Sequence, residues 1–229
     1  SAPDAAAAAF EVLFGQPSLE TLRLSERARW VHLSSAGYER YASPEAAQLL
    51  RERGVRLTNS STPYAVPCAE QALAGMLMLA RRLDLCSSAA ERGRWASAHH
   101  RARSSLVSGA EVMLLGFGAI GRALAHRLQA LGARVQAFRR RPSPGDPVPT
   151  FGGAELDARL AEADFVVSLL PGGGATRGLM SAERFAQMKP GSFFVNVGRG
   201  TTVDQQALLQ ALERGPLAGA YLDVTDPEP

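Results

Sequence analysis

Three glycines spaced as G-x-G-x-x-G are the first residues of this chain whose spacing points to chemistry. Gly116, Gly118 and Gly121 follow the apolar run Val112–Leu115, and Arg122–Leu131 then carries apolar residues at helical spacing. This order predicts a strand, a tight turn and a helix. In such a unit the first glycine lets the chain reverse, the second lets the backbone approach a pyrophosphate, and the third lets helix and strand pack closely. We therefore predict a dinucleotide site at this turn.

Basic residues farther along the chain indicate which dinucleotide this turn would bind. The backbone amides near Ala119 and Ile120, at the start of the helix, would hold the phosphates. The place that usually offers a carboxylate to the adenosine ribose is Arg139, followed by Arg140, and the stretch 134–145 contains no Asp or Glu. A guanidinium suits a ribose 2′-phosphate, so we predict NADP(H) in preference to NAD(H). The alternative is that these arginines bind no ligand and are simply exposed to solvent, because arginine is the common basic residue of this chain.

Alternating strands and helices must position these residues. From Glu111 onward, short apolar runs alternate with stretches of helical periodicity, which is typical of a doubly wound parallel (Rossmann) α/β sheet covered on both faces. The expected strands are Val112–Leu115, Arg134–Phe138, Asp164–Leu169, Ser192–Val197 and Ala218–Val224. The expected helices are Arg122–Leu131, Ala154–Ala161, Ser181–Met188 and Asp204–Arg214.

The first third of the chain repeats this rhythm in miniature, which predicts a second, smaller α/β domain. The expected elements are helices at Ala5–Ala9, Pro17–Arg27 and Pro44–Arg53 and strands at Phe10–Phe14, Trp30–Leu33 and Val55–Thr58. The polar, proline-containing segment that ends at Pro67 predicts a domain hinge over Thr62–Pro67. We therefore expect a smaller domain over 1–66 and a dinucleotide-binding domain over 67–229.

Two further segments have a less definite interpretation. Cys68–Leu85 is expected to form one long helix, apolar almost all round and buried at a domain or subunit interface, and Ser87–Ser108 to be polar and irregular. The turn at Ala36, Gly37 and Tyr38 follows a strand. Its place is where α/β proteins bind ligands, but a tight connection between strand and helix would have the same composition.

The composition limits the classes of partner. The chain of 229 residues is 46% hydrophobic and 21% charged, as in an ordinary globular protein. Its net charge is +3, but Lys189 is the only lysine among 25 basic residues, and most arginines are interspersed with acidic residues. That arrangement argues against a nucleic-acid-binding surface. No apolar run approaches the roughly 18 residues of a membrane span, so no membrane partner is expected either.

Cysteine and histidine usage leads to two further expectations. Cys68 and Cys86 are the only cysteines, and we interpret them as free thiols in a reducing compartment, which together with a start that lacks a basic signal region predicts a cytoplasmic protein. The adjacent His99 and His100 have no Cys or carboxylate at ligand spacing, so no metal site is expected.

Six ordered segments resemble the D-2-hydroxyacid dehydrogenases, among which the glyoxylate/hydroxypyruvate reductases are the most similar. The segments are SSAGYER, VPCAEQALAGMLMLAR, LLGFGAIGRALAHRLQALGARV, ADFVVSLLPGGGATRGLM, MKPGSFFVNVGRGTTVDQQALLQAL and AGAYLDVTDPEP. The resemblance extends from about Phe10 to the end of the chain. It implies a flavodoxin-like smaller domain that binds substrate, and a homodimer formed through the region of Cys68–Leu85.

The resemblance also implies catalytic roles. Arg199, in NVGRG, would bind and polarise the substrate, because a guanidinium can hold the carboxylate and carbonyl oxygens of a 2-keto acid. Flanking Gly198 and Gly200 are expected to leave room for that ligand. Glu228, in DPEP, would be the carboxylate that pairs with the family's catalytic histidine and raises its pKa, so that the histidine can protonate the carbonyl.

Further positions follow from the same resemblance. Backbone amides of Ala36, Gly37 and Tyr38 would receive the substrate carboxylate, which favours the ligand-binding interpretation of that turn. Besides the glycine turn and the arginines, the residues expected to contact the cofactor are Ala119, Ile120, Leu170, Pro171, Thr176, Val197 and Asp223.

Two features of the family pattern have no counterpart in this sequence. The catalytic histidine of the family lies beyond the position of Glu228, and none of His32, His99, His100 or His126 matches it. The first strand and helix of the smaller domain and its returning C-terminal helix are also missing. We therefore expect the smaller domain to be N-terminally incomplete, the larger one to be truncated at its end, and the chain to be part of a longer one.

The expected function is that of an oxidoreductase. The enzyme would transfer a hydride between a nicotinamide cofactor and a small 2-keto or D-2-hydroxy acid such as glyoxylate or hydroxypyruvate. Two alternatives remain: a dinucleotide-sensing regulatory protein of the same fold, and a dehydrogenase of another small anion such as formate or phosphite.

Overall fold

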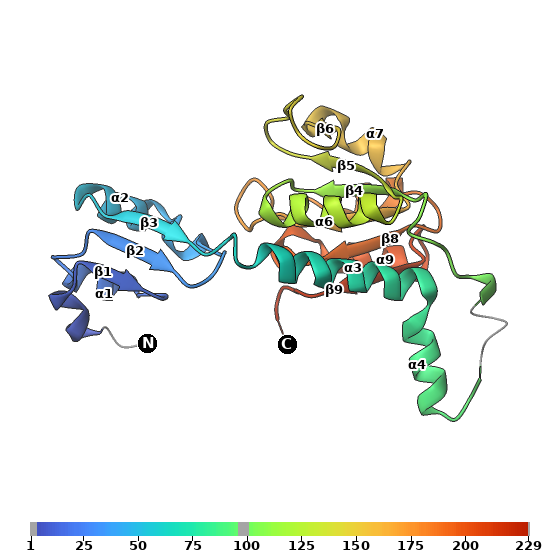
Figure 1. Cartoon of the computed structure of the whole chain (residues 1–229), viewed down its shortest axis with the longest axis horizontal. Helices are drawn as coiled ribbons and strands as arrows, with labels where there is room; N and C mark the ends of the chain where they lie inside the picture. The colour runs from blue at the N-terminus through green and yellow to red at the C-terminus, as the bar shows by residue number, and fades with distance from the viewer. Residues whose placement is uncertain (1–3, 96–100, 229) are drawn as a thin grey trace. The chain divides into compact units, whose positions relative to one another are not determined.

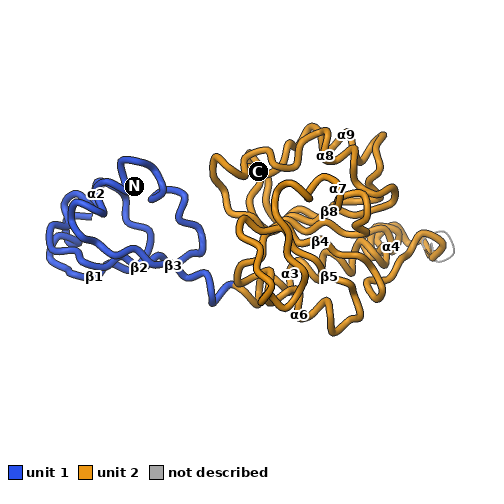
Figure 2. The backbone as a smooth tube through the Cα atoms, turned by 90° about the horizontal axis from the view of Figure 1, so that it is seen from above, with its two compact units in different colours: residues 1–64 blue, residues 65–229 orange. Residues whose placement is uncertain are grey.

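The chain folds into two compact units, residues 1–64 and 65–229 (Figure 2). The computed structural model describes residues 4–95 and 101–228. His99 and His100 lie outside the described residues, and so does part of the segment Ser87–Ser108.

The first unit is built on a three-stranded parallel sheet, in the order β1-β2-β3. Its elements are η1 (Ala5–Ala9), β1 (Val12–Phe14), α1 (Leu19–Leu24), β2 (Trp30–Leu33), η2 (Glu39–Tyr41), α2 (Pro44–Glu52) and β3 (Arg56–Asn59). Both α-helices begin at a serine whose hydroxyl accepts an amide hydrogen bond, from Thr21 to Ser18 at 3.0 Å and from Ala46 to Ser43 at 3.2 Å. The expected smaller α/β domain is thus confirmed as a parallel sheet with helices.

Strand alternation gives this small sheet one buried and one exposed face. Val31 and Leu33 are fully buried and pack with Leu22 of α1 and Leu50 of α2. The residues of the opposite phase, such as Phe14 and Trp30, are exposed. The helices therefore cover one face of the sheet.

The second unit is a doubly wound sheet whose described strands run in the order β6-β5-β4-β7-β8-β9, all parallel (Figure 1). The strands are β4 (Glu111–Leu115), β5 (Arg134–Phe138), β6 (Thr150–Phe151), β7 (Phe165–Ser168), β8 (Phe193–Asn196) and β9 (Gly219–Leu222). The helices are α3 (Ala65–Arg81), α4 (Leu83–Glu91), α6 (Ala119–Ala130), η3 (Gly153–Glu155), α7 (Leu156–Leu160), α8 (Ala182–Gln187), η4 (Gly200–Thr202) and α9 (Gln205–Glu213). The predicted Rossmann sheet is confirmed.

Two hydrophobic cores cover the two faces of this sheet. On β4, Val112 and Leu114 point into a core shared with α3 and α6. Met113 and Leu115, in the opposite phase, point into a core shared with α7, α8 and α9. All four side chains are fully buried. This is why the strand reads as a continuous apolar run rather than an alternating one.

The single long helix expected over Cys68–Leu85 is wrong. It breaks at Arg82, whose φ of 54° is left-handed, and a second helix continues through Glu91, into the segment expected to be irregular. The Arg82 guanidinium donates to the carbonyl oxygen of Ala218 at 3.0 Å and lies 5.0 Å from the ring centroid of Phe193, which fixes the break. Leu77 is 37% exposed in the single chain, so the expected burial of this helix at a domain or subunit interface stays a prediction.

Two smaller differences concern segments that carry prolines. The helix α3 already begins at Ala65, so the end of the expected hinge Thr62–Pro67 forms its first turn, where proline is tolerated. The short strand β6, which pairs with β5, has no counterpart among the expected elements. Its two residues are too few to produce a periodic pattern.

Candidate functional site

The carboxyl ends of the parallel strands bring the predicted residues of the second unit to one edge of the sheet. The chain runs from β4 outward to β5 and β6, and returns to build β7, β8 and β9 on the other side of β4. The edge beside β4 and β7 is therefore a topological switch point, where open α/β sheets bind ligands. The glycine turn follows β4, Arg139 follows β5, and Leu170, Arg199 and Asp223 follow β7, β8 and β9.

The three glycines of the turn meet different constraints. Gly116 has a φ of +108°, which an L side chain rarely adopts. A Cβ at Gly121 would lie 2.6 Å from the carbonyl oxygen of Gly116, so this position must be glycine for helix and strand to pack. A Cβ at Gly118 would meet nothing within 4 Å. The fold thus does not require glycine at position 118. The absence of a side chain there leaves the start of α6, at Ala119 and Ile120, open to a ligand.

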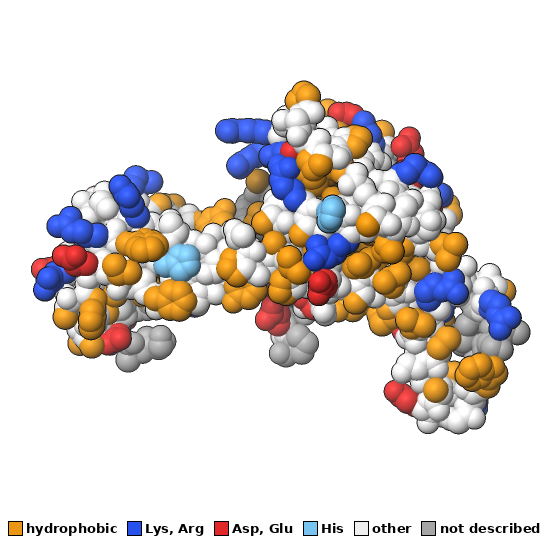
Figure 3. Space-filling view, viewed as in Figure 1, with side chains coloured by type: hydrophobic (Ala, Val, Ile, Leu, Met, Phe, Trp, Pro, Cys, Tyr) orange, Lys and Arg blue, Asp and Glu red, His pale blue; other side chains and the backbone are white. Residues whose placement is uncertain are grey.

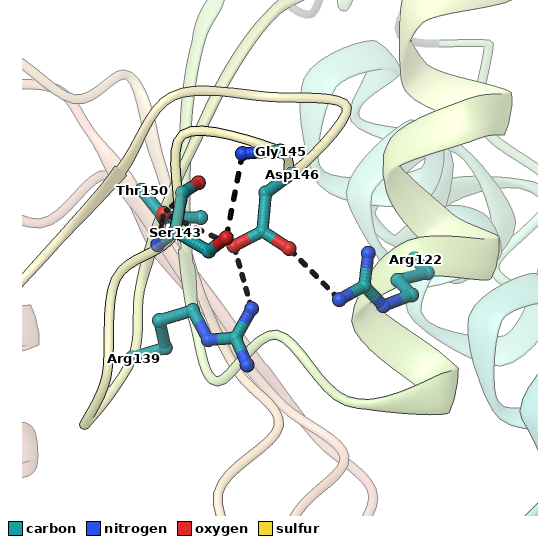
Figure 4. Close-up of polar contacts among 6 residues, drawn as sticks. All are labelled: Arg122, Arg139, Ser143, Gly145, Asp146 and Thr150. Carbon is teal, nitrogen blue, oxygen red and sulfur yellow. Dashed lines mark hydrogen bonds and ion pairs between the residues drawn. The ribbon is translucent and has the colours of Figure 1, made fainter.

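An ion-paired cluster lies between the first turns of α6 and the end of β5 (Figure 4). The Asp146 carboxylate accepts a hydrogen bond from Arg139 at 2.5 Å, from Arg122 at 2.8 Å and from the Thr150 hydroxyl at 3.1 Å. Its side chain is only 3% exposed. Burial raises the pKa of Asp146, but the hydrogen bonds from the two arginines and Thr150, with the charge of Arg139, hold it below its usual value. Arg140, next in the chain, is exposed.

Sequence reasoning missed Asp146. The search for a ribose-binding acid ended at residue 145, and Asp146 comes next. The loop after β5 folds back and returns this carboxylate to Arg139. The only available signal was the loop's proline and glycine content, which predicts a turn without fixing where its side chains point.

Buried polar contacts fix the segment that carries Arg199. Fully buried Asn196, the last residue of β8, accepts from the amide of Gly198 and donates to the carbonyl oxygen of Arg199, both at 3.1 Å. The hydroxyl of Thr202 donates to that same carbonyl oxygen at 2.7 Å. The side chain of Arg199 is partly exposed, and its guanidinium donates to the carbonyl oxygen of Gly198 at 2.8 Å. The backbone under this arginine is thus held rigidly.

The glycines beside Arg199 were expected to leave room for a ligand, but they do not. A Cβ at Gly198 would lie 2.6 Å from the carbonyl oxygen of Leu170. A Cβ at Gly200 would lie 2.0 Å from the carbonyl carbon of Thr225. The space is filled by neighbouring backbone, and the glycines are needed for that packing. Val197, before them, is buried.

Asp223 lies beside helix α3. Its amide donates to the carbonyl oxygen of Asn196 at 2.9 Å, and its carboxylate accepts from the Gln71 side chain at 3.1 Å. The same Gln71 amide contacts the Tyr221 hydroxyl. Cys68, one turn earlier on α3, is affected by this environment. Burial and the Asp223 carboxylate raise the pKa of its thiol, while the Arg199 guanidinium opposes them.

The loop after β7 is closed by its own side chains. The Thr176 hydroxyl donates to the carbonyl oxygen of Pro171 at 2.7 Å, and Leu170 is buried in the core below. These three residues, predicted to contact the cofactor, come together at the carboxyl end of β7.

In the first unit, the turn Ala36–Tyr38 directs its carbonyl groups toward the protein. The Ala36 carbonyl oxygen accepts from Asn59 at 2.7 Å, and that of Gly37 accepts from Ser35 at 2.9 Å. The side chain of Tyr38 is 46% exposed. Because side chains hold the carbonyl groups, the turn has a defined conformation at the carboxyl end of β2.

The remaining predicted positions are less constrained. Glu228 is exposed near the end of the chain. Of the histidines, His32 lies in the first unit and contacts the hydroxyls of Thr58 and Ser60 at 2.7 and 3.0 Å, and His126 lies on α6. Within residues 4–95 and 101–228, no group of three or more His, Cys, Asp or Glu side chains is arranged to hold a metal ion. No helix in these ranges is long and apolar enough to cross a membrane.

Comparisons with known proteins agree with this geometry. Residues 73–229 match the family model of the D-isomer specific 2-hydroxyacid dehydrogenase, NAD binding domain. The chain is 31% identical over 220 residues to glyoxylate/hydroxypyruvate reductase A of Serratia proteamaculans, covering 95% of this chain and 69% of the relative. It is 33% identical over 218 residues to glyoxylate reductase of Thermococcus onnurineus, covering 92% and 64%. The chain thus spans about two thirds of the length of these relatives.

A solved structure supports the same relationship. The D-isomer specific 2-hydroxyacid dehydrogenase from Xanthobacter autotrophicus Py2, in complex with NADPH and MES, superimposes with a TM-score of 0.83. It shares 31% sequence identity, and the match covers 97% of this chain and 69% of that one. The fold, the glycine turn and these relatives lead to one conclusion. The chain belongs to the D-isomer specific 2-hydroxyacid dehydrogenase family, a family of oxidoreductases with a Rossmann nucleotide-binding domain.

Proposed function

We propose that this protein transfers a hydride between NADP(H) and a small 2-keto or D-2-hydroxy acid such as glyoxylate or hydroxypyruvate. The observation that carries the proposal is the placement of Arg199, rigidly held after β8, on the same sheet edge as the glycine turn and Asp223. Relatives named glyoxylate/hydroxypyruvate reductase and glyoxylate reductase support the substrate class.

The residues after β4 fit the cofactor's pyrophosphate. Gly118 has open space where a side chain would stand, and the 12-residue helix α6 begins directly after it without a side-chain cap. Its first amides, at Ala119, Ile120 and Gly121, and the positive end of the helix dipole suit a phosphate. Asp223 would hold the nicotinamide carboxamide. When bound, NADPH supplies the hydride.

Two arginines at the end of β5 support NADP(H) over NAD(H). Arg139 and Arg140 present guanidinium groups where NAD-specific folds offer a carboxylate to the ribose diol. Asp146 lies close by, but its two oxygens accept hydrogen bonds from Arg139 and Arg122. The relative from Xanthobacter autotrophicus, crystallised with NADPH, is consistent with this preference.

Arg199 would hold the carboxylate and carbonyl oxygens of the 2-keto acid and stabilise the negative charge that develops on the carbonyl oxygen. Amides of Ala36, Gly37 and Tyr38, in the smaller substrate domain, would receive the substrate carboxylate. Glu228 would raise the pKa of the proton-donating histidine that the family resemblance implies.

The test is NADPH oxidation by the full-length protein with glyoxylate and with hydroxypyruvate. Arg199→Ala should lower kcat/KM by about 100-fold or more, the usual effect of removing one group that stabilises an oxyanion. Arg134→Gln, which removes an exposed ion pair with Glu111 at the other end of β5, should leave it within about twofold. Near-normal turnover of Arg199→Ala would refute the assigned role. Cofactor binding without turnover by the wild type would indicate a dinucleotide sensor instead.

We further propose that the protein acts in the cytoplasm as a homodimer. Both cysteines are free, as expected of a reducing compartment. On α3 and α4, Leu77 is 37%, Leu83 52% and Leu85 39% exposed. Figure 3 shows hydrophobic side chains at the surface over these two helices. None of the residues of α4 is buried. An exposed apolar surface of this kind is typical of an interface between subunits.

A further inference from the structure

Asp146 is a buried carboxylate that joins two arginines from different elements. Arg122 comes from α6, directly after the glycine turn, and Arg139 follows β5. Both guanidinium groups point at the Asp146 carboxylate (Figure 4), each to a different oxygen. The Asp146 side chain is 3% exposed, whereas those of Arg122 and Arg139 are 46% and 28% exposed. The acid therefore lies between the two guanidinium groups and is nearly covered, while both arginine side chains remain partly exposed.

The two arginines also come from the two elements that surround a bound adenosine ribose in a Rossmann fold, the first helix and the end of the second strand. Each guanidinium carries five N–H donors, and the bond to Asp146 uses one on each. Arg122 is oriented further by Phe117, with 4.8 Å between its guanidinium carbon and the ring centroid. Both groups therefore have a fixed position and further donors to offer.

We propose that Arg122 is a second 2′-phosphate-binding residue, held beside Arg139 by their shared partner Asp146. The inference rests on the proposed preference for NADP(H) and adds a residue to it. Two neighbouring guanidinium groups repel each other, and their attraction to the ionised carboxylate between them offsets that repulsion while leaving the cluster a net positive charge. A phosphate bound beside both arginines would then contact two preorganised guanidinium groups instead of one mobile side chain.

Adenosine 2′,5′-bisphosphate and 5′-AMP form a matched pair of probes, because they differ only in the 2′-phosphate. Isothermal titration of the full-length wild type should show tighter binding of the bisphosphate. Arg122→Gln should weaken the bisphosphate by about tenfold, as expected for one charge-assisted contact, and change 5′-AMP by less than twofold. Arg134→Gln, with its ion pair on the opposite end of β5, is the matched control and should change neither affinity. Thermal unfolding of each variant verifies folding.

The outcomes separate this inference from the proposed function. Equal affinities of the wild type for both nucleotides would overturn the NADP(H) preference and the inference with it. A selective wild type whose preference survives in Arg122→Gln but is lost in Arg139→Gln would overturn only the role of Arg122. Asp146→Asn, which can no longer accept from both arginines, should also weaken the bisphosphate selectively. Tighter binding by that variant would show that Asp146 competes with the phosphate and would overturn its positioning role.

Discussion

At the scale of single residues, Gly198 and Gly200 allow the backbone of three loops to pack closely around Arg199. Gly200 lies against the backbone of Thr225 and Asp226, and Gly198 against that of Leu170. These loops follow β7, β8 and β9, and they carry the proposed cofactor and substrate residues Leu170, Arg199 and Asp223. The glycines therefore position Arg199 through packing, and their effect on activity should come through stability.

Gly200→Ala should lower the free energy of unfolding by about 1–3 kcal/mol, because its Cβ would lie 2.0 Å from the carbonyl carbon of Thr225 and backbone would have to move. The matched control is Gly174→Ala, where a Cβ would meet nothing within 4 Å. Urea unfolding followed by circular dichroism measures both. Equal stability of the two variants would contradict the packing role.

The two cysteines should differ in reactivity, because the thiolate is the nucleophile. Burial and Asp223 raise the pKa of Cys68, whereas Cys86 is exposed. In single-cysteine variants made with Cys→Ser, Cys86 should react faster with a disulfide reagent at pH 8, and the rate at Cys68 should rise only at higher pH. Asp223→Asn should move the Cys68 profile to lower pH, since it removes a charge that raises the pKa. An unchanged profile would refute the influence of Asp223.

For the candidate site, residue types predicted which side chains come together better than they predicted the contacts of those side chains. Glycine spacing and strand ends placed Gly116, Arg139 and Arg199 at one sheet edge, because parallel strands end together. The partners of these residues were not predictable. Asp146 reaches Arg139 through an irregular loop, and Gln71 reaches Asp223 across 152 positions of the sequence. Neither contact leaves a periodic signal.

At the scale of elements, the turn between β4 and α6 separates glycines needed for folding from the one available for binding. Gly118 has a φ of −89° and space for a Cβ, whereas Gly121 contacts Gly116 closely. Gly118→Ala should leave the free energy of unfolding within about 0.5 kcal/mol of the wild type. It should weaken NADPH binding by about tenfold, because the methyl group would occupy the approach of the pyrophosphate.

The counterpart is Gly121→Ala, whose Cβ would lie 2.6 Å from the Gly116 carbonyl oxygen. This variant should lose stability as well as binding. Urea unfolding and titration with NADPH, done on both variants, distinguish the two roles. Binding by Gly118→Ala equal to that of the wild type would remove the turn from the proposed pyrophosphate site.

Elements with strong periodicity were the most predictable. The strands β2 and β5 begin and end at the expected residues, and in both of them buried side chains alternate with more exposed ones. The break between α3 and α4 was not predictable, because Arg82 is an ordinary helix-forming residue. Its left-handed backbone is held by contacts to Ala218 and Phe193, more than a hundred residues away.

At the scale of the whole molecule, exposed apolar side chains connect the fold to assembly. The core of the second unit covers both faces of the sheet, but the outer side of α3 and the residues of α4 remain accessible. The apolar pattern of Cys68–Leu85 predicted a buried helix. Such a pattern does not distinguish burial within one chain from burial between two chains, and the exposed leucines fit burial between two chains.

If this surface joins two copies, the mass in solution should respond to a charge placed on it. Light scattering during size-exclusion chromatography should give the wild-type full-length protein twice its chain mass. Leu83→Glu should shift it to one chain mass, because a buried carboxylate in an apolar interface lacks a partner. Leu131→Glu, at a 42% exposed site at the end of α6, is the control and should remain dimeric. A wild type with a single chain mass, or a Leu83→Glu variant that stays dimeric, would place the subunit contact elsewhere or exclude it.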